Sequence, residues 1–247
     1  MTCTSADEQE SGGPITLSID IGGTKMKAGK VDSGGTLIGA PVIASTPRPA
    51  PPEAVLRAVG EMVAGIAGFD RISIAFPGIV RGTKVITAPN LGTAQWNNFD
   101  MVAAVSSAYG KPVRILNDAA VQGLGVVRGP GLDTVITLGT GVGCAVYRNR
   151  RWLLHLELGF DAEIGNEALR SIGAEAWNER LREKIRYVAR LTACDRLYIG
   201  GGNARKVAGE LPETLELVSN DAGLTGGVRL WEAELDDLLG SVPVLER

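Results

Sequence analysis

The sequence of 247 residues is poor in the side chains that bind structural zinc, with one histidine and three cysteines. Cys3, Cys144 and Cys194 are scattered, and no two of them stand at the short spacing of a zinc ligand pair. The single histidine, His155, cannot complete a metal site by itself. We therefore expect no zinc, and the sparse cysteines predict a reducing, cytoplasmic location.

The signals of a membrane, secreted or nucleic-acid-binding protein are also missing. No apolar run approaches the roughly 18 residues of a membrane-spanning helix. The first fourteen residues, MTCTSADEQESGGP, are polar and acidic rather than signal-like, and we expect residues 1–14 to form a disordered tail. The formal net charge of −3 gives no electrostatic footprint for a polyanionic partner. Small molecules, rather than nucleic acid or a membrane, are the expected partners.

Glycine, in contrast, is abundant: 33 residues are about twice the usual share of roughly 7%, so many tight turns are expected. A pattern of three short strands with a glycine turn after the first occurs in each half of the chain. The alternative is a pair of unrelated glycine hairpins, because the local identity is low. The expected strands are residues 15–20, 25–31 and 36–38 in the first half, and 133–138, 144–147 and 151–154 in the second.

Strands alternate with helices after each of these meanders, which predicts an α/β fold in two lobes. We expect a small lobe over residues 15–118, a large lobe over 119–247 and a hinge near 116–128. The expected helices are residues 52–67, 99–109 and 165–191 and a closing helical segment, 221–239, and the further strands are 71–75, 113–116, 196–199 and 215–218.

Three glycine turns each follow an apolar strand: DIGGTK at 20–25, LGTGVG at 138–143 and IGGGN at 199–203. Glycine lets backbone N–H groups approach an anion, and threonine adds a hydroxyl donor. The three turns together predict a phosphate cradle between the lobes, and purely structural turns are the alternative. Neither a Walker A loop nor a GxGxxG sequence leading into a helix is present.

Two aspartates stand at the ends of predicted strands. Asp20 is placed to position Mg²⁺ beside the first glycine turn, or else to cap that turn. Asp118, after Asn117, lies where a strand ends and a helix begins, the edge at which α/β sheets bind ligands. It could accept the proton of an attacking hydroxyl, or could simply cap the helix, and the pattern alone leaves both open.

Two further polar residues are candidates for binding a polyol. Glu157 follows the second meander, and its carboxylate can accept two hydroxyl hydrogen bonds from a sugar. Asn90, in TAPN, offers an amide donor and acceptor. Both residue types are also common in surface loops.

Taken together, these stretches resemble the ROK sugar kinases, within the actin-like, hexokinase and Hsp70 superfamily of ribonuclease H-like fold. Polyphosphate glucokinases and their relatives are the most similar group. The resemblance covers nearly the whole chain after residue 14. It is carried by IDIGGTKMKAG, FPGIVRGTKVITAPNL, ILNDAAVQGLG, TLGTGVGCAV, LELG, LYIGGGNARK and SNDAGLTGG.

The resemblance implies a two-lobed fold with a ligand cleft and a role for each motif residue. Asp118 would be the catalytic base, with Asn90, Asn117 and Glu157 on the sugar. The donor and its Mg²⁺ would be bound by the glycine turns. The implied donor-binding residues are Asp20, Gly22, Gly23, Thr24, Lys25, Gly139, Thr140, Gly141, Gly201 and Gly202, with Asp20 also the candidate Mg²⁺ ligand.

The resemblance also implies a function: phosphoryl transfer from polyphosphate or ATP to a hexose, with C6 of glucose as the expected acceptor and a homodimer as the expected assembly. One position departs from the family, because the usual E-x-G-H motif has Phe160 in place of its histidine. A catalytically weak sugar-binding or regulatory protein, or a kinase of another polyol, therefore stays open. Lys25, Lys27, Lys30, Arg81 and Lys84 are candidates for a cationic polyphosphate track, or ordinary surface charges.

Overall fold

Runs of apolar residues form strands that are buried almost throughout. In β1 (Thr16–Ile21) every residue except Asp20 is buried, and in β4 (Arg71–Phe76) every residue after Arg71 is buried. The structure, a computed structural model, describes residues 12–236 and Leu239. Most of the predicted 1–14 tail therefore lies outside the described residues.

Ten of the strands make two five-stranded sheets with the same topology. The strand orders are β3-β2-β1-β4-β8 and β11-β10-β9-β12-β13, so each sheet is an antiparallel meander extended by two parallel strands. The predicted repeat of architecture is confirmed. The remaining strands of these sheets are β2 (Lys25–Val31), β3 (Leu37–Ser45), β8 (Val113–Asn117), β9 (Leu132–Leu138), β10 (Val142–Arg148), β11 (Arg151–Leu156), β12 (Arg196–Gly200) and β13 (Leu215–Leu217).

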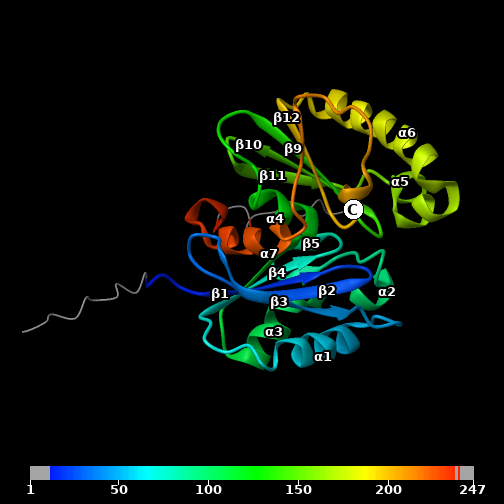
Figure 1. Cartoon of the computed structure of the whole chain (residues 1–247). Helices are drawn as coiled ribbons and strands as arrows, with labels where there is room; N and C mark the ends of the chain where they lie inside the picture. The colour runs from blue at the N-terminus through cyan, green and yellow to red at the C-terminus, as the bar shows by residue number, and fades with distance from the viewer. Residues whose placement is uncertain (1–11, 237–238, 240–247) are drawn as a thin grey trace, which may run out of the picture.

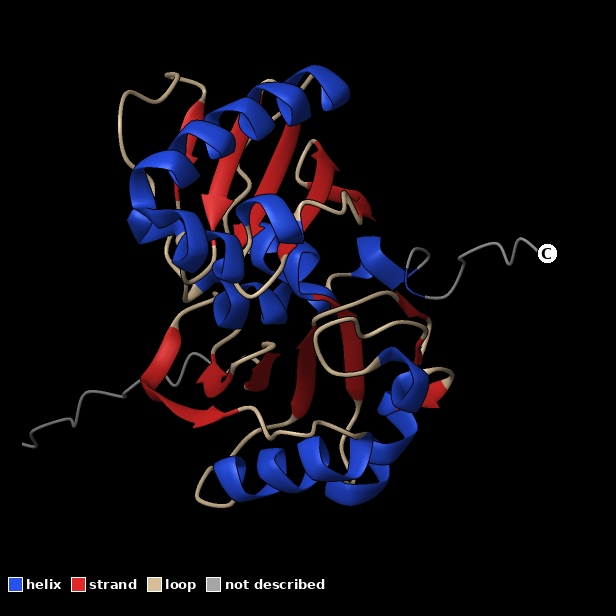
Figure 2. Ribbon diagram, turned by 90° about the vertical axis from the view of Figure 1, so that its right-hand side faces the viewer, coloured by secondary structure: helices blue, strands red, loops and turns tan. Residues whose placement is uncertain are grey.

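Helices lie between the two sheets and on their outer faces (Figure 1). Between the sheets are α4 (Asp118–Leu124) and α7 (Ala222–Thr225), while α1 (Pro52–Val63) and α3 (Met101–Tyr109) cover the far side of the first sheet. The far side of the second sheet carries α5 (Asp161–Ile164) and α6 (Asn166–Thr192). Figure 2 shows the same layers from the side, with the strands of the two sheets separated by the central helices.

The helix α4 joins the two halves because it is buried on all sides. Small side chains, among them Ala119 and Ala120, let both sheets approach it closely. One apolar cluster contains α4 together with Leu116 of the first sheet and Tyr147 of the second. The Tyr147 hydroxyl donates to the Ala120 carbonyl at 2.5 Å. This packing fixes the ends of the strands that border the space between the sheets.

After β13 the chain returns to the first sheet. The Ser18 hydroxyl of β1 donates to the carbonyl of Leu224 at 2.7 Å, and the Ser73 hydroxyl of β4 donates to that of Gly227 at 2.7 Å. Only glycine fits at position 227, since a Cβ there would collide with the Ser18 hydroxyl. Trp231, in the 3₁₀ helix Gly226–Trp231, donates its indole N–H to Ser73 at 2.8 Å. Residues 222–231 thus complete the face of the first sheet that looks toward α4.

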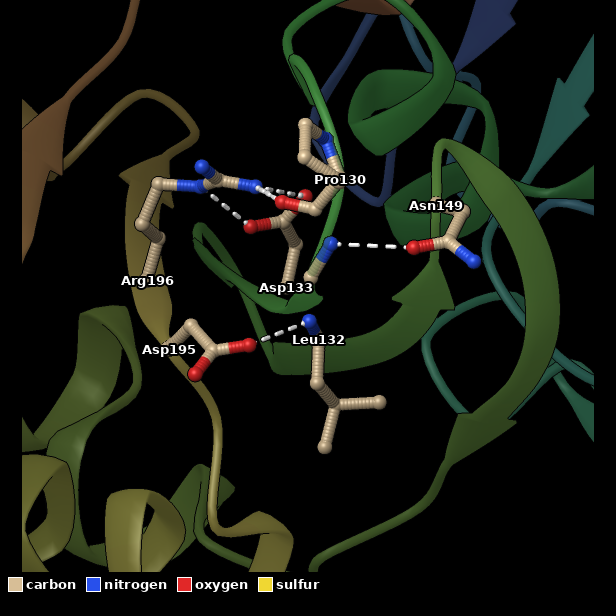
Figure 3. Close-up of polar contacts among 7 residues, drawn as sticks. Pro130, Leu132, Asp133, Asn149, Asp195 and Arg196 are labelled. Atoms are coloured by element: carbon tan, nitrogen blue, oxygen red, sulfur yellow. Dashed lines mark hydrogen bonds and ion pairs between the residues drawn. The ribbon is translucent and has the colours of Figure 1, made fainter.

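A polar cluster fixes the amino-terminal ends of β9 and β12 (Figure 3). Arg196 Nε lies 2.6 Å from the fully buried carboxylate of Asp133, and its Nη2 donates to the Pro130 carbonyl at 2.6 Å. Asp195 accepts from the Leu132 amide at 2.7 Å. A buried carboxylate needs such partners, so the cluster sets the register of these two central strands. Figure 3 also shows Asn149, which accepts from the Gly131 amide at 3.0 Å.

Several predicted boundaries were wrong. The first helix ends at Val63 rather than 67, and residues 99–100 form a short strand before α3. The long helix is interrupted at Gly173, whose φ of 79° lies outside the helical region. The closing segment forms the short α7 and two 3₁₀ helices, because tertiary contacts with the first sheet replace helical continuation. The short elements not yet named are β5 (Val80–Arg81), β6 (Lys84–Val85), β7 (Phe99–Asp100), α2 (Thr93–Trp96) and the 3₁₀ helices Ala204–Lys206 and Ala233–Leu235.

No helix within residues 12–236 combines the length and apolar character that crossing a membrane requires. The division into lobes at residue 118 and the hinge near 116–128 remain predictions. The structure adds that residues 222–231 pack on the sheet of the first half.

Candidate active site

A cleft of about 860 Å³ lies where the carboxyl ends of central strands from both sheets face each other. Every site residue expected from the sequence lines this cleft, although these residues are spread over more than 180 positions of the chain. They are Asp20, Gly22, Gly23, Thr24, Lys25, Asn90, Asn117, Asp118, Gly139, Thr140, Gly141, Glu157, Gly201 and Gly202.

The sequence left open whether Asp118 is a proton acceptor or the cap of a helix. In the structure Asn117, rather than Asp118, caps the helix. Asn117 is the N-cap of α4: its Oδ1 accepts from the Ala120 amide at 3.2 Å, and its Nδ2 donates to the Gly78 carbonyl at 3.1 Å. Both polar atoms of the Asn117 side chain are therefore hydrogen-bonded to the backbone. Asp118, the first residue of α4, accepts from the Ala119 amide at 2.8 Å and is half-buried at the cleft wall. Because Asn117 provides the cap, the carboxylate of Asp118 is available to the cleft.

The surroundings of Asp118 disfavour its ionised form. Burial is the largest cause and raises the pKa of its carboxyl from 3.8 to about 7. The negative charge of Asp20 and, more weakly, that of Glu157 act in the same direction, while the amide of Ala119 opposes them. A carboxylate with a pKa near neutrality is suited to take a proton from an alcohol and return it.

Asp20 is the second carboxylate of the cleft, at the end of β1. Burial raises its pKa from 3.8 to about 6, and Lys27, its cross-strand partner on β2, moderates the rise. Lys27 also donates to the Asn220 carbonyl at 3.0 Å and lies 3.8 Å from Asp221, so its charge is shared. A cation would relieve the repulsion between the two cleft aspartates.

These carboxylates fit a magnesium ion that is shared with phosphate. Mg²⁺ is usually held by one or two carboxylates, water and substrate phosphates rather than by a cage of protein ligands. Among residues 12–236 no group of three or more His, Cys, Asp or Glu side chains gathers as a metal site. Cys144 is buried, Cys194 is partly buried, and Cys3 lies outside the described residues.

The first two glycine turns meet across the cleft. The hydroxyls of Thr24 and Thr140 are 2.9 Å apart and share a hydrogen bond. A Cβ at Gly23 would lie 3.0 Å from Asn90 and 3.2 Å from Thr140, so a larger residue there would push these side chains slightly apart. Such paired turns place backbone N–H groups and hydroxyls at one end of the cleft, where an anionic group can be bound.

The third glycine turn packs behind the second. Gly201, with a φ of 85°, sits against the backbone of Leu138. Asn203 holds the two turns together, because its amide N–H donates to the Leu138 carbonyl at 2.9 Å and its Nδ2 donates to that of Gly139 at 3.2 Å. Gly201 and Gly202 consequently form the wall of the cleft next to the second turn.

Glu157, in the loop after β11, and Asn90, in the loop after β6, both line the cleft, but Phe160 does not. Burial, with a smaller contribution from the charge of Asp161, raises the pKa of Glu157. The Phe160 ring packs edge-on against Tyr187 of α6, with a centroid distance of 5.8 Å. The residue that departs from the family motif therefore contacts the outer helix.

The structure adds polar residues that the sequence did not reveal as site candidates. Asp161 Oδ1 accepts from the Val142 amide at 2.6 Å and so supports the second glycine turn. Gln122 lies in the cleft wall near Gly200. Arg170 lines the cleft from α6, where helical periodicity alone would have assigned it to an exposed face. The only sequence signal for Asn203 is its position as the last residue of the third glycine turn, IGGGN.

The sequence left open whether five basic residues form a cationic track or are ordinary surface charges, and two of the five line the cleft. Lys25 and Lys27 line the cleft, but Lys30 donates to the Ala67 carbonyl at 3.0 Å, away from it. Arg81 and Lys84 lie on β5 and β6 and do not line the cleft. Arg170 and Arg205 are the further cations that line the cleft.

Comparison with known proteins agrees with this geometry. A sequence model of the ROK family matches residues 16–177. The polyphosphate glucokinase of Mycobacterium tuberculosis (strain ATCC 25177 / H37Ra) is 31% identical over 92% of this chain and 96% of its own. Another polyphosphate glucokinase, from Mycobacterium leprae, is 30% identical over 89% of this chain and 75% of its own.

Solved structures show the same fold. The inorganic polyphosphate/ATP-glucomannokinase from Arthrobacter sp. strain KM superposes with a TM-score of 0.80 at 29% identity, covering 88% of this chain and 98% of its own. A ROK family glucokinase from Streptomyces griseus gives a TM-score of 0.72 at 20% identity over 87% of this chain and 98% of its own. The expected two-lobed actin-like α/β fold is confirmed. With the family model matching well over half of its length, the chain belongs to the ROK family.

Proposed function

We propose that this protein is a sugar kinase that transfers a phosphoryl group from polyphosphate or ATP to a hexose, with C6 of glucose as the acceptor. The enzyme class is a phosphotransferase with an alcohol acceptor, as in the polyphosphate glucokinases to which the chain is similar. The observation that carries the finer proposal is the position of Asp118. Its half-buried carboxylate, with a pKa raised to about 7, shares one cleft with two glycine–threonine turns.

In the proposed reaction the Asp118 carboxylate accepts the proton of the sugar hydroxyl as that oxygen attacks the terminal phosphorus of the donor. The bond between this phosphorus and the rest of the donor breaks, and the shortened polyphosphate or ADP leaves. Glu157 and Asn90 bind other hydroxyls and hold the reacting one toward Asp118. The turns at Thr24 and Thr140 supply N–H and O–H donors to the phosphoryl oxygens. Bound Mg²⁺ would neutralise phosphate charge next to Asp20.

Inorganic polyphosphate is supported as a donor by the cations around the outer cleft. Arg170 and Arg205 belong to the segments that follow Asn166 and Asn203, and both asparagines donate to the Gly139 carbonyl, so the arginines flank the second glycine turn. The guanidinium group of neither arginine forms a hydrogen bond or ion pair within the described residues. Unpaired guanidinium groups beside a phosphate-binding turn favour a long polyanion.

The test is an initial-rate screen of the purified protein with Mg²⁺, in which glucose, mannose, fructose and N-acetylglucosamine are each combined with ATP and with polyphosphate. Asp118→Asn is the control variant. We expect turnover with glucose that the variant loses. Turnover that survives in the variant would refute the role of Asp118, and turnover only with another sugar would replace glucose as the acceptor.

The second candidate is a sugar-binding or regulatory protein without useful turnover, and Phe160 favours it. A histidine at this position would be a hydrogen-bond partner near the sugar, whereas Phe160 packs against α6. Isothermal calorimetry separates the two candidates, because sugar binding without turnover for any donor supports the second. A kinase of another polyol would give turnover outside the four hexoses.

We further propose a homodimer in the cytoplasm. The exposed apolar side chains of Leu153 and Leu154, on the edge strand β11, support self-association. Light scattering during gel filtration tests the dimer, and a monomeric mass across the working concentration range would contradict it.

A further inference from the structure

We propose that Phe160 is a positioning residue that anchors the loop bearing Glu157 and Asp161 to helix α6, and that this anchor holds the sugar site in register with the second glycine turn. The inference rests on the proposed kinase function. It assigns a role to the aromatic residue that stands outside the cleft.

The Phe160 ring is held on α6 by two side chains. Tyr187 contacts it edge-on at a centroid distance of 5.8 Å and an interplanar angle of 74°. The ammonium of Lys184 lies 4.5 Å from the ring centroid and is in turn 2.6 Å from the Glu163 carboxylate. Glu163 belongs to α5, the short helix that Phe160 begins. Phe160 and Glu163, three residues apart, therefore both contact the face of α6 that carries Lys184 and Tyr187.

The chain that follows Phe160 contacts the second glycine turn directly. Asp161, the next residue, accepts from the Val142 amide at 2.6 Å. Asn166, at the start of α6, donates its amide to the Gly139 carbonyl at 3.0 Å. A Cβ at Gly141 would lie 3.0 Å from the Asp161 carboxylate, so these groups are in close contact. Movement of the loop would therefore also disturb the turn that is proposed to bind phosphate.

Glu157 depends on the same anchor because its own side chain makes no polar contact, within the part of the chain that the structure describes, that would hold it. Between Glu157 and Phe160 the chain passes through Gly159, which has a φ of 69° and no atom within 4 Å of where its Cβ would be. Glycine gives this connection conformational freedom. No hydrogen bond or ion pair of the Glu157 side chain occurs within the described residues. Leu158 packs against the apolar core of the second half, and the docking of Phe160 fixes the chain beyond Gly159, so the two contacts together set where the Glu157 carboxylate points.

The experiment compares Phe160→Ala with Phe160→Tyr, Lys184→Met and a matched control, Phe99→Ala. Phe99 is also a partly buried aromatic in an edge-on pair, with Trp96 at 5.5 Å, and it does not line the cleft. For Phe160→Ala we expect the KM for sugar and the KM for donor each to rise about tenfold, with kcat changed less than threefold. Phe160→Tyr should restore both KM values to within about threefold of the wild type, and Lys184→Met should give a smaller rise than Phe160→Ala.

Amide hydrogen exchange provides a readout that does not depend on activity. In the substrate-free Phe160→Ala protein the amides of Val142 and Asn166 should exchange about tenfold faster than in the wild type, whereas Phe99→Ala should leave them unchanged. If the wild type lacks kinase activity, the proposed function fails and this exchange result still decides the anchor. Equal losses of thermal stability in Phe160→Ala and Phe99→Ala, with both KM values and both amides unaffected, would overturn the proposal.

Discussion

Replacing Asp118 with asparagine should inactivate the protein and stabilise it at the same time. Asparagine keeps the size of the side chain, and its Oδ1 can still accept from the Ala119 amide, which is 2.8 Å from Asp118. It cannot accept a proton from the attacking hydroxyl. Loss of a general base of this kind costs roughly 10²–10⁴-fold in kcat, while the KM for sugar should change little because Glu157 and Asn90 are intact.

The stability gain follows from the pKa of Asp118. Folding raises this pKa from 3.8 to about 7, chiefly by burial, so the unfolded chain ionises at a lower pH than the folded one. The ionised carboxylate therefore destabilises the folded state progressively as the pH rises from about 4 to 7, and fully above 7. The shift corresponds to at most about 4 kcal/mol. Water in the cleft lowers the realised gain, and we expect a gain of roughly 1–3 kcal/mol at pH 8 and none near pH 4.

The assay pairs urea unfolding at pH 8 and at low pH with initial rates at pH 8. Asp100→Asn is the matched control, because Asp100 also accepts a backbone amide at the start of a helix, from Ala103 at 2.9 Å, but lies away from the cleft. The control should keep full activity. A less stable Asp118→Asn protein at pH 8 would refute the argument from burial, and a near-normal kcat would refute the assignment of the base.

The second cleft carboxylate, the outer arginines and the tryptophan that docks the C-terminal segment each predict a measurable change. Asp20→Asn removes a negative charge that raises the pKa of Asp118, so carboxyl NMR should show Asp118 titrating at a lower pH than in the wild type. The double variant Arg170→Ala/Arg205→Ala should raise the KM for polyphosphate about tenfold or more and the KM for ATP less. Trp231→Leu should cost roughly 2–4 kcal/mol of stability, since the ring loses its hydrogen bond to Ser73 and two stacked guanidinium groups.

For each of these predictions a control or a contradicting outcome can be named. An unchanged titration of Asp118 in the Asp20→Asn protein would show that the two carboxylates are not coupled. Arg180→Ala, on the exposed part of α6 and outside the cleft, should leave the KM for polyphosphate unaltered. If it has the same effect as the double variant, general surface charge is responsible. For Trp231→Leu, kcat well below the unfolding transition should match the wild type, because Trp231 does not line the cleft.

Local sequence determined most of the elements and the residues around the cleft. Short runs rich in β-branched and apolar residues, such as ITLSID and DTVITL, predict buried strands, and the glycine turns after them let the backbone approach a ligand. Asp20 stands at the end of the central strand β1, and Asp118 follows the edge strand β8, which runs parallel to β4 beside it. Their position at the cleft follows because the carboxyl ends of these parallel strands meet at one edge of an α/β sheet. The resemblance to the ROK kinases predicted how these elements are arranged, in a two-lobed fold with a ligand cleft.

Tertiary contacts alone decided the remaining features. The spacing of residues 221–239 predicts a helix, yet docking of Leu224, Gly227 and Trp231 on the first sheet divides residues 222–235 into short helical turns. Gly173 breaks the long helix, although the apolar pattern continues through it. Arg170 lines the cleft, and Phe160 lies outside it. Neither position could be predicted, because the placement of α6 depends on its packing on the second sheet rather than on the periodicity of its own sequence. A residue's own segment fixes its local conformation, but only the packing of distant segments decides which side chains share a cavity.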